Sequence, residues 1–238
     1  RYRNSNLYID GALGNTIEFW AKADNPDEAP ITFFHIGNES IDNPKIKVSL
    51  NQSNELECVY RDDTGNGTFE VFDLTTLSES FLQNTWNHFV FCFINNGLSI
   101  KTDIYKNGNL LFSSVSGTSL EEVSQRQLYL NINGTLDSIG ADTLFTSSGI
   151  YLDDFRFWKR KRTEEEIGRY WHTHVYGGTN TDEEKYNSEN RNVDIGIYYK
   201  FNEVTGSYTN NSITLDSSGN SLHSFITNFE QSSRSRKG

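Results

Sequence analysis

The stretch WNHFVFCFINNGLSIKTDIYKNGNLLF, residues 86–112, decides the fold of this chain. Its first nine residues are aromatic or β-branched at nearly every position, with one alternating set formed by Phe89, Phe91 and Phe93 and the other by His88, Val90, Cys92 and Ile94. A strand that is apolar on both sides predicts burial of both faces. Turns are predicted at NNG, residues 95–97, and at NG, residues 107–108, where a type I′ turn needs two positive φ angles. The stretch therefore predicts one β-hairpin and the start of a second.

Composition narrows the classes of partner. The 238 residues include 21 Lys and Arg against 32 Asp and Glu, so the net charge of −11 disfavours nucleic acid and anionic membranes. No apolar run approaches the roughly 20 residues of a membrane span. Because Met is absent even at position 1, we expect the chain to be a piece of a longer polypeptide. Cys58 and Cys92 both lie in predicted strands, which favours reduced, buried thiols over a disulfide.

Short strands are predicted along the rest of the chain at the spacing typical of a β-sandwich. They cover residues 6–10, 16–21, 32–36, 45–50, 55–61, 68–72, 127–132 and 150–158. One helix is predicted where Thr163 and Glu166 form a capping box, with Ile167, Tyr170 and Trp171 on its apolar face. The expected fold class is all-β, a two-sheet antiparallel sandwich with one short capped helix after the last core strand.

The predicted segments divide the chain into three parts. Residues 1–176 form the sandwich, and the polar residues 177–194 read as a linker. Residues 195–238 carry a further strand, IGIYYKF, at 195–201. Two readings stay open, because the tail either completes the sandwich or opens a following repeat. If it folds back, the edge beside residues 150–158 is the expected partner.

Four segments carry a family resemblance, in the order TIEFWAK, WNHFVFCF, DIYKNGNLLF and YLDDFRFWKRKRTEEEI. Together they resemble the laminin-G-like jelly-roll domains of the concanavalin A-like superfamily, over residues 6–176. The tail segments IGIYYKFNE and LDSSGNSLHSF resemble the opening strand of that family, so their order here is permuted. A narrower resemblance is to large virion structural proteins of marine tailed phages. It implies a virion or extracellular location, with other subunits or repeats of a large assembly as partners.

Catalysis is not expected. Retaining glycosidases on this superfamily's fold need two carboxylates about 5 Å apart, commonly arranged as E-x-D-x-x-E on one strand. That motif does not occur in the sequence. Asp153 and Asp154 are adjacent in a predicted strand, so they should point to opposite faces and form no such pair. We therefore expect a non-enzymatic protein without a catalytic cofactor.

The resemblance also implies a structural calcium ion where the last strand meets the first. Asp153, with Asp216 from the tail, would then supply the oxygen ligands. The residues themselves favour another reading, in which these acids accept hydrogen bonds in turns or pair with Arg156. Calcium is thus the one candidate cofactor, and both readings stay open.

Two functions follow from the sequence. The first is a non-catalytic module of a large virion structural protein, used for assembly contacts or attachment to the host surface. The alternative is a carbohydrate-binding module of a secreted adhesin or glycoside-active enzyme, which would bind host surface glycans. Aromatic residues outside the strands, including Tyr176, Tyr186 and Tyr208, are candidates for stacking on sugar rings.

Overall fold

The structure is a computed structural model. It describes residues 13–24, 31–37, 44–51, 53, 55–61, 67–95, 99–116, 129–132, 135–136, 142–143, 150–172, 195–203, 213–219 and 222–225. The strand predicted at residues 6–10 and most of the turn predicted at 95–97 lie outside these residues.

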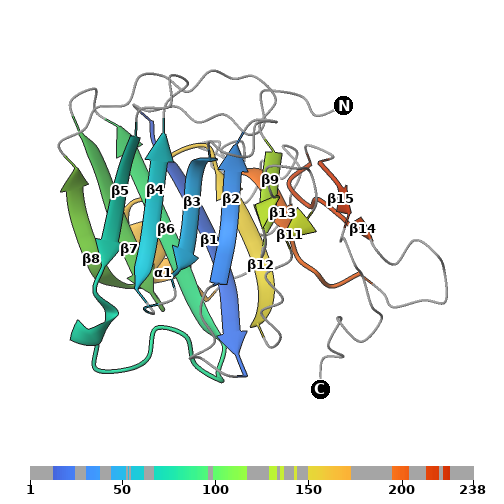
Figure 1. Cartoon of the computed structure of the whole chain (residues 1–238). Helices are drawn as coiled ribbons and strands as arrows, with labels where there is room; N and C mark the ends of the chain where they lie inside the picture. The colour runs from blue at the N-terminus through green and yellow to red at the C-terminus, as the bar shows by residue number, and fades with distance from the viewer. Residues whose placement is uncertain are drawn as a thin grey trace.

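Two antiparallel sheets pack face to face (Figure 1). The six-stranded sheet has the order β13 (Ile195–Tyr199), β12 (Ile150–Trp158), β1 (Asn15–Ala23), β6 (Asn87–Asn95), β7 (Ile100–Lys106) and β8 (Asn109–Ser116). The five-stranded sheet has the order β5 (Gly67–Phe72), β4 (Leu56–Arg61), β3 (Pro44–Leu50), β2 (Ile31–Gly37) and β9 (Tyr129–Ile132). Two small hairpins complete the described strands, β10 (Thr135–Leu136) with β11 (Asp142–Thr143) and β14 (Ile213–Thr214) with β15 (Ser224–Phe225). The predicted all-β sandwich is confirmed.

The central hairpin forms as its pattern predicts. β6 lies between β1 and β7, and both of its faces are buried, because Phe89 and Phe91 on one side and His88 and Val90 on the other are each at most 1% exposed. The turn from β7 to β8 has φ angles of 50° at Asn107 and 79° at Gly108, the positive values that a type I′ turn requires.

The core fills the space between the two sheets with aromatic rings. Phe19 of β1 lies at its centre, with ring centroids 5.9 Å from Phe91 and 6.1 Å from Phe155. From the opposite sheet, Phe34 meets Phe91 edge to face at 5.8 Å. Cys58 and Cys92 are both free and buried, so the expectation of reduced thiols is confirmed. Burial raises the pKa of the Cys92 thiol to about 12, so this thiol stays protonated at neutral pH.

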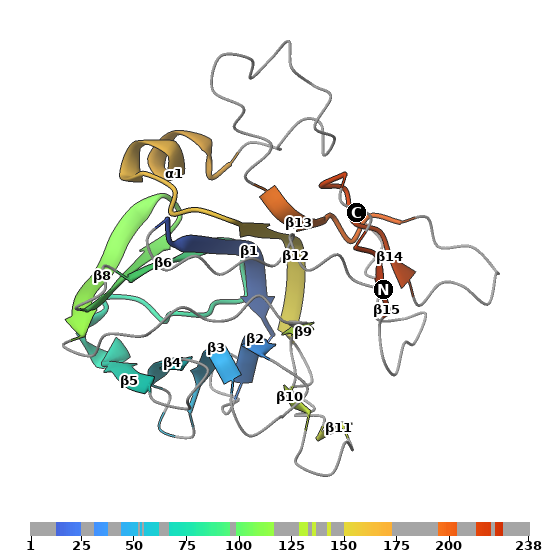
Figure 2. The ribbon, with the colours of Figure 1, turned by 90° about the horizontal axis from the view of Figure 1, so that it is seen from above.

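One α-helix, α1 (Glu164–Tyr170), lies on the outer face of the six-stranded sheet, away from the five-stranded sheet (Figure 2). It begins with the predicted capping box, because the Thr163 side chain accepts from the Glu166 amide and the Glu166 side chain accepts from the Thr163 amide. A single 3-10 turn, η1 (Leu74–Thr76), precedes β6. No described helix is long and apolar enough to cross a membrane.

The tail strand lies at the edge where the sequence placed it. β13 pairs antiparallel with β12, with Tyr199 opposite Phe155 and Ile197 opposite Phe157. All five residues of β13 are buried. β13 thereby extends the sheet by one strand, and β14 and β15 lie beyond it (Figure 2).

Candidate functional site

The outer face of the six-stranded sheet is ordered in rows by the pairing of β12, β1 and β6. Residues directly opposite each other in an antiparallel pair share a face. The rows run Trp158–Thr16–Cys92, Arg156–Glu18–Val90, Asp153–Trp20–His88 and then Tyr151–Lys22. The first two rows are buried, whereas the last reaches solvent. The face therefore passes from a buried polar cluster to an exposed aromatic end.

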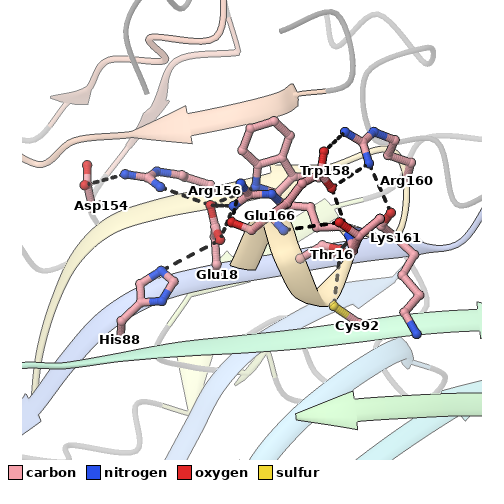
Figure 3. A network of polar contacts seen from close by, with 12 residues as sticks. Thr16, Glu18, His88, Cys92, Asp154, Arg156, Trp158, Arg160, Lys161 and Glu166 are labelled. Atoms are coloured by element: carbon pink, nitrogen blue, oxygen red, sulfur yellow. Dashed lines mark hydrogen bonds and ion pairs between the residues drawn. The ribbon is translucent and has the colours of Figure 1, made fainter. Parts of the chain in front are cut away.

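Glu18 is the centre of the buried polar cluster (Figure 3). Its Oε1 accepts hydrogen bonds from Arg156 Nη1 at 3.0 Å and from Trp158 Nε1 at 2.9 Å. Its Oε2 accepts from Arg162 Nη1 at 2.8 Å. Arg156 also bonds Asp154 at 2.8 Å, so the two carboxylates and the two guanidinium groups form one buried network.

Burial and the neighbouring charges determine the protonation states of Glu18 and His88. Burial opposes ionisation of Glu18, but Arg162 and Arg156 outweigh it and lower the pKa of the carboxyl to about 2. His88 lies 3.8 Å from Glu18, yet burial lowers its pKa to about 4, which leaves the imidazole neutral at pH 7. Neither ring nitrogen of His88 has a hydrogen-bond partner among the described residues. Glu18 is therefore ionised at neutral pH and fully buried, so it has no proton to give to a substrate there.

A β-bulge shapes the network. The pairing of β1 with β12 shifts between Glu18 and Trp20, and Asp154 has a φ angle of 54°. Because of the extra residue, Asp153 stands opposite Trp20 while Asp154 reaches Arg156 two residues on. The expectation that Asp153 and Asp154 point to opposite faces was therefore wrong. The bulge turns Asp154 to the same outer face, where Arg156 holds it.

The chain that follows β12 seals the cluster from outside. The Arg162 amide donates to Thr16 Oγ1 at 2.8 Å, and the Arg160 guanidinium binds both oxygens of Glu166, at 2.8 and 3.0 Å. Ile167 of α1 is fully buried and packs with Val90 on the outer face. These contacts fix α1 over the first two rows.

Trp171 follows the helix and covers the cluster on the side of Trp20 and His88. Its ring lies 5.6 Å from Trp20 and 6.3 Å from His88, between centroids. Gly108 lies beneath this ring, and a Cβ there would come within 2.5 Å of it. The β7 to β8 turn thus needs glycine for its φ angle and also for the close approach of Trp171.

Tyr151 and Lys22 of the last row, with the neighbouring Trp86 and Asp24, form an exposed surface that we call the aromatic platform. The Lys22 ammonium lies 4.6 Å from the Tyr151 ring centroid and 5.5 Å from the Trp86 centroid. The Tyr151 hydroxyl donates to Asp24 at 2.9 Å. Trp86 is 40% exposed, which is unusual for so large an apolar side chain. Two rings, one cation and one carboxylate are thereby presented together to solvent.

The two residues predicted to bind calcium lie on different strands. Asp216 forms a bridge with Tyr199 of β13, whereas Asp153 is on β12, so β13 runs between them. At the usual spacing, two strand steps separate their backbones by roughly 10 Å.

The Asp216 carboxylate is already engaged. It accepts four hydrogen bonds of 2.7 to 3.0 Å, from the amides of Tyr198, Ser218 and Leu222 and from the Ser218 hydroxyl. Asp153 accepts from the Asp154 amide at 3.0 Å. Within the described ranges, no group of three or more His, Cys, Asp or Glu is placed to hold a metal. Calcium binding stays a prediction, and the contacts of Asp216 favour a structural role.

The sequence did not predict the cluster around Glu18. The alternation in TIEFWAK puts Glu18 on the face opposite Ile17 and Phe19, which is normally the solvent side. The basic run RFWKRKR, residues 156–162, was the available signal, since it lies next to a strand and holds both arginines that bind Glu18. Tyr176, Tyr186 and Tyr208, proposed for sugar stacking, lie outside the described residues.

Residues 4–168 match the family described as the concanavalin A-like lectin/glucanases superfamily. No curated protein matches the sequence. A solved structure of a candidate carbohydrate-binding protein from Bacteroides ovatus has a TM-score of 0.52 at 13% identity, over 89% of this chain and 51% of that one. The leech intramolecular trans-sialidase in complex with 2,7-anhydro-Neu5Ac has a TM-score of 0.50 at 14% identity, over 70% and 24%.

The receptor binding domain of botulinum neurotoxin mosaic serotype C/D has a TM-score of 0.47 at 16% identity, over 67% of this chain and 36% of that one. The chain thus spans between about a quarter and about half of the length of these three proteins. At these identities the likeness concerns the fold alone.

Proposed function

The chain belongs to the concanavalin A-like lectin/glucanases superfamily, and from this membership we propose that it is a non-catalytic carbohydrate-binding module. The observation that carries the proposal is the aromatic platform at the exposed end of the outer face. Trp86 and Tyr151 flank Lys22, and Asp24 lies at the hydroxyl of Tyr151.

The chemistry of the platform suits a sugar. A pyranose has an apolar face of C–H groups, which stacks on an indole or phenol ring, and a rim of hydroxyl groups, which needs charged or polar partners. Trp86 supplies the exposed ring, while Lys22 and Asp24 supply a donor and an acceptor beside it. The ammonium of Lys22 would also favour a sugar that carries a carboxylate.

A non-catalytic role is consistent with the acids of this face. A retaining glycosidase needs one acid with a raised pKa beside a second carboxylate, both open to the substrate. Glu18 instead has its pKa lowered to about 2 and is fully buried, and Asp154 is bound to Arg156. Glu18 and Asp154 are thus both ion-paired with arginines.

The virion role suggested by the sequence has less on its side. It rests on the sequence resemblance alone, whereas the glycan role also has the aromatic platform. A module that binds surface glycans works outside the cell, and an extracellular location is part of this proposal. The similar structure from Bacteroides ovatus is described as a candidate carbohydrate-binding protein, and this description is its only support for a glycan ligand.

The test is a glycan array probed with the 238-residue chain, followed by calorimetry of any ligand found. We expect a dissociation constant between about 1 μM and 1 mM, weakened about tenfold or more by Trp86→Ala and by Tyr151→Ala. Val71→Ala is the matched control, because Val71 is 44% exposed and lies on the other sheet. Melting curves of each variant establish that the fold is intact.

Two results would count against the proposal. An array without any hit would refute glycan binding itself. A hit whose affinity is unchanged in Trp86→Ala and Tyr151→Ala would place the ligand elsewhere and remove the platform from the proposal.

A further inference from the structure

Lys22 of the aromatic platform carries a positive charge that has no anion beside it. Its ammonium lies over the rings of Tyr151 and Trp86, 4.6 and 5.5 Å from their centroids. Among the described residues, none forms an ion pair with this ammonium or accepts a hydrogen bond from it. An aromatic face attracts a cation without neutralising its charge. The charge of Lys22 and its N–H donors therefore stay available to a ligand.

Two lysines elsewhere on the sandwich are paired differently. Lys101 lies 3.4 Å from the Asp103 carboxylate, and Lys161 binds the other oxygen of the same group. Those two charges are thus largely neutralised by a carboxylate that the chain itself supplies. At the platform, the described contacts of Lys22 are with rings instead.

The backbone holds Lys22 and Trp86 next to each other. Ala23, which follows Lys22, is fully buried, and its amide donates to the Gln83 carbonyl at 2.9 Å. Asn87, which follows Trp86, is also buried and pairs with β1. Both side chains therefore project from anchored backbone, and the two rings hold the ammonium in place. A lysine held in this way loses less rotamer entropy on binding than a free one.

The carboxylate of the platform lies at a different place from this charge. Asp24 accepts a hydrogen bond from the hydroxyl at the tip of Tyr151, at 2.9 Å, whereas Lys22 lies over the face of the same ring. A ligand that spans the platform therefore meets a hydrogen-bond acceptor at one end and a positive charge at the other. The exposed Trp86 ring lies on the side of the charge.

We propose that the platform binds an acidic sugar, whose carboxylate or sulfate pairs with the Lys22 ammonium while its ring stacks on Trp86. This inference rests on the proposed carbohydrate-binding function and names the class of sugar. An ammonium is a compact point charge that accepts either anion, and a charge-assisted hydrogen bond is about twice as strong as a neutral one. The net charge of −11 repels anions at long range, but charges beyond about 8 Å are largely screened at physiological ionic strength.

Calorimetry of the 238-residue chain with matched pairs of sugars tests the proposal. The pairs are sialyllactose with its methyl ester, trigalacturonate with its methyl ester, and sulfated lactose with lactose, so that each pair differs in charge. In at least one pair the acidic member should bind about fivefold or more tightly than the neutral one. Lys22→Gln should remove this preference, and Lys22→Arg should keep it. Whether the carboxylate pairs or the sulfate pair shows the preference identifies the anion.

The ratio of the two affinities in a pair separates the charge of Lys22 from its packing. If Lys22→Gln only disturbed the rings, it would weaken the acidic and the neutral sugar equally, whereas loss of the charge weakens the acidic one alone. Lys200→Gln is the matched control, because it changes the net charge equally and the Lys200 ammonium also lies over a ring, 5.0 Å from the centroid of the buried Tyr198. That variant should keep the preference.

The possible failures are distinguishable. Neutral sugars that bind as tightly as their acidic counterparts would overturn this inference and leave the carbohydrate-binding function standing. An acidic preference that survives Lys22→Gln would overturn it too, because the anion would then bind elsewhere. A glycan array and calorimetry in which no sugar binds would refute the carbohydrate-binding function itself, and this inference with it.

Discussion

Glu18 and Arg156 face each other across β1 and β12, with Oε1 3.0 Å from Nη1 and at most 1% of either side chain exposed. A buried charge is stable only when it is paired and hydrogen bonded. Here the pair joins β1 to β12, and Arg162, in the segment that leads into α1, binds the same carboxylate. The cluster is thus a link between three parts of the fold.

Replacing Glu18 with Gln should therefore be costly. The substitution leaves Arg156 and Arg162 buried without their shared anion, and breaking a buried pair in this way costs roughly 3–5 kcal/mol. Urea denaturation at pH 7 measures the loss. Glu165→Gln is the control, because its i,i+4 pair with Arg169 is about two thirds exposed on both sides and should matter by no more than about 0.5 kcal/mol. If both variants lost equally little, the cluster would not stabilise the fold.

The buried histidines predict a stability that falls with acid. Burial lowers the pKa of His88 and of His35 to about 4, from 6.5 in the unfolded chain. Between pH 6.5 and 4 these histidines are protonated in the unfolded chain but neutral in the folded one. The free energy of unfolding is therefore largest above pH 6.5 and falls as the pH drops towards 4. Each histidine contributes up to about 3 kcal/mol to this loss. Below pH 4.5, protonation of unfolded Glu18 adds to it, because the folded carboxyl has a pKa of about 2.

Urea midpoints between about pH 7 and pH 4 measure this dependence. His88→Gln and His35→Gln should each flatten the profile, whatever their effect at pH 7. Exposed His172 offers the control, since His172→Gln changes no buried group. A profile that is flat in the unchanged chain, or equally steep in both variants, would contradict the neutral buried state of these rings.

Strand positions could be predicted from sequence because alternation is local. The pattern at residues 86–112 and the capping box at Thr163 each hold all the information their elements need. The bulge at Asp154 could not be predicted, because it arises from the long-range register between β12 and Trp20. The burial of Glu18 likewise depends on α1 returning over the sheet. Position along a strand was thus predictable, whereas what covers a face was not.

Calcium should change the stability of the chain little or not at all. Asp216 already accepts four hydrogen bonds, so a calcium ion would have to displace donors that are in place. Asp216→Ala should lower the free energy of unfolding by at least about 2 kcal/mol with or without the ion, because buried amides lose their acceptor. Thermal melting with calcium or with chelator measures both effects. Micromolar binding by calorimetry that Asp153→Ala abolishes would instead establish a calcium site.

The division of the chain at residue 176 can be tested by truncation. β13 buries Ile195, Ile197, Tyr198 and Tyr199 against the sandwich, and Tyr198 lies 5.0 Å from the guanidinium of Arg156. A chain that ends at Tyr176 loses these contacts and exposes the edge of β12, so it should melt at a lower temperature and aggregate. A chain that ends at Phe225 keeps every described strand and is the control. If the shorter chain stayed monomeric and melted with the control, residues 195–238 would be the start of another unit rather than part of this sandwich.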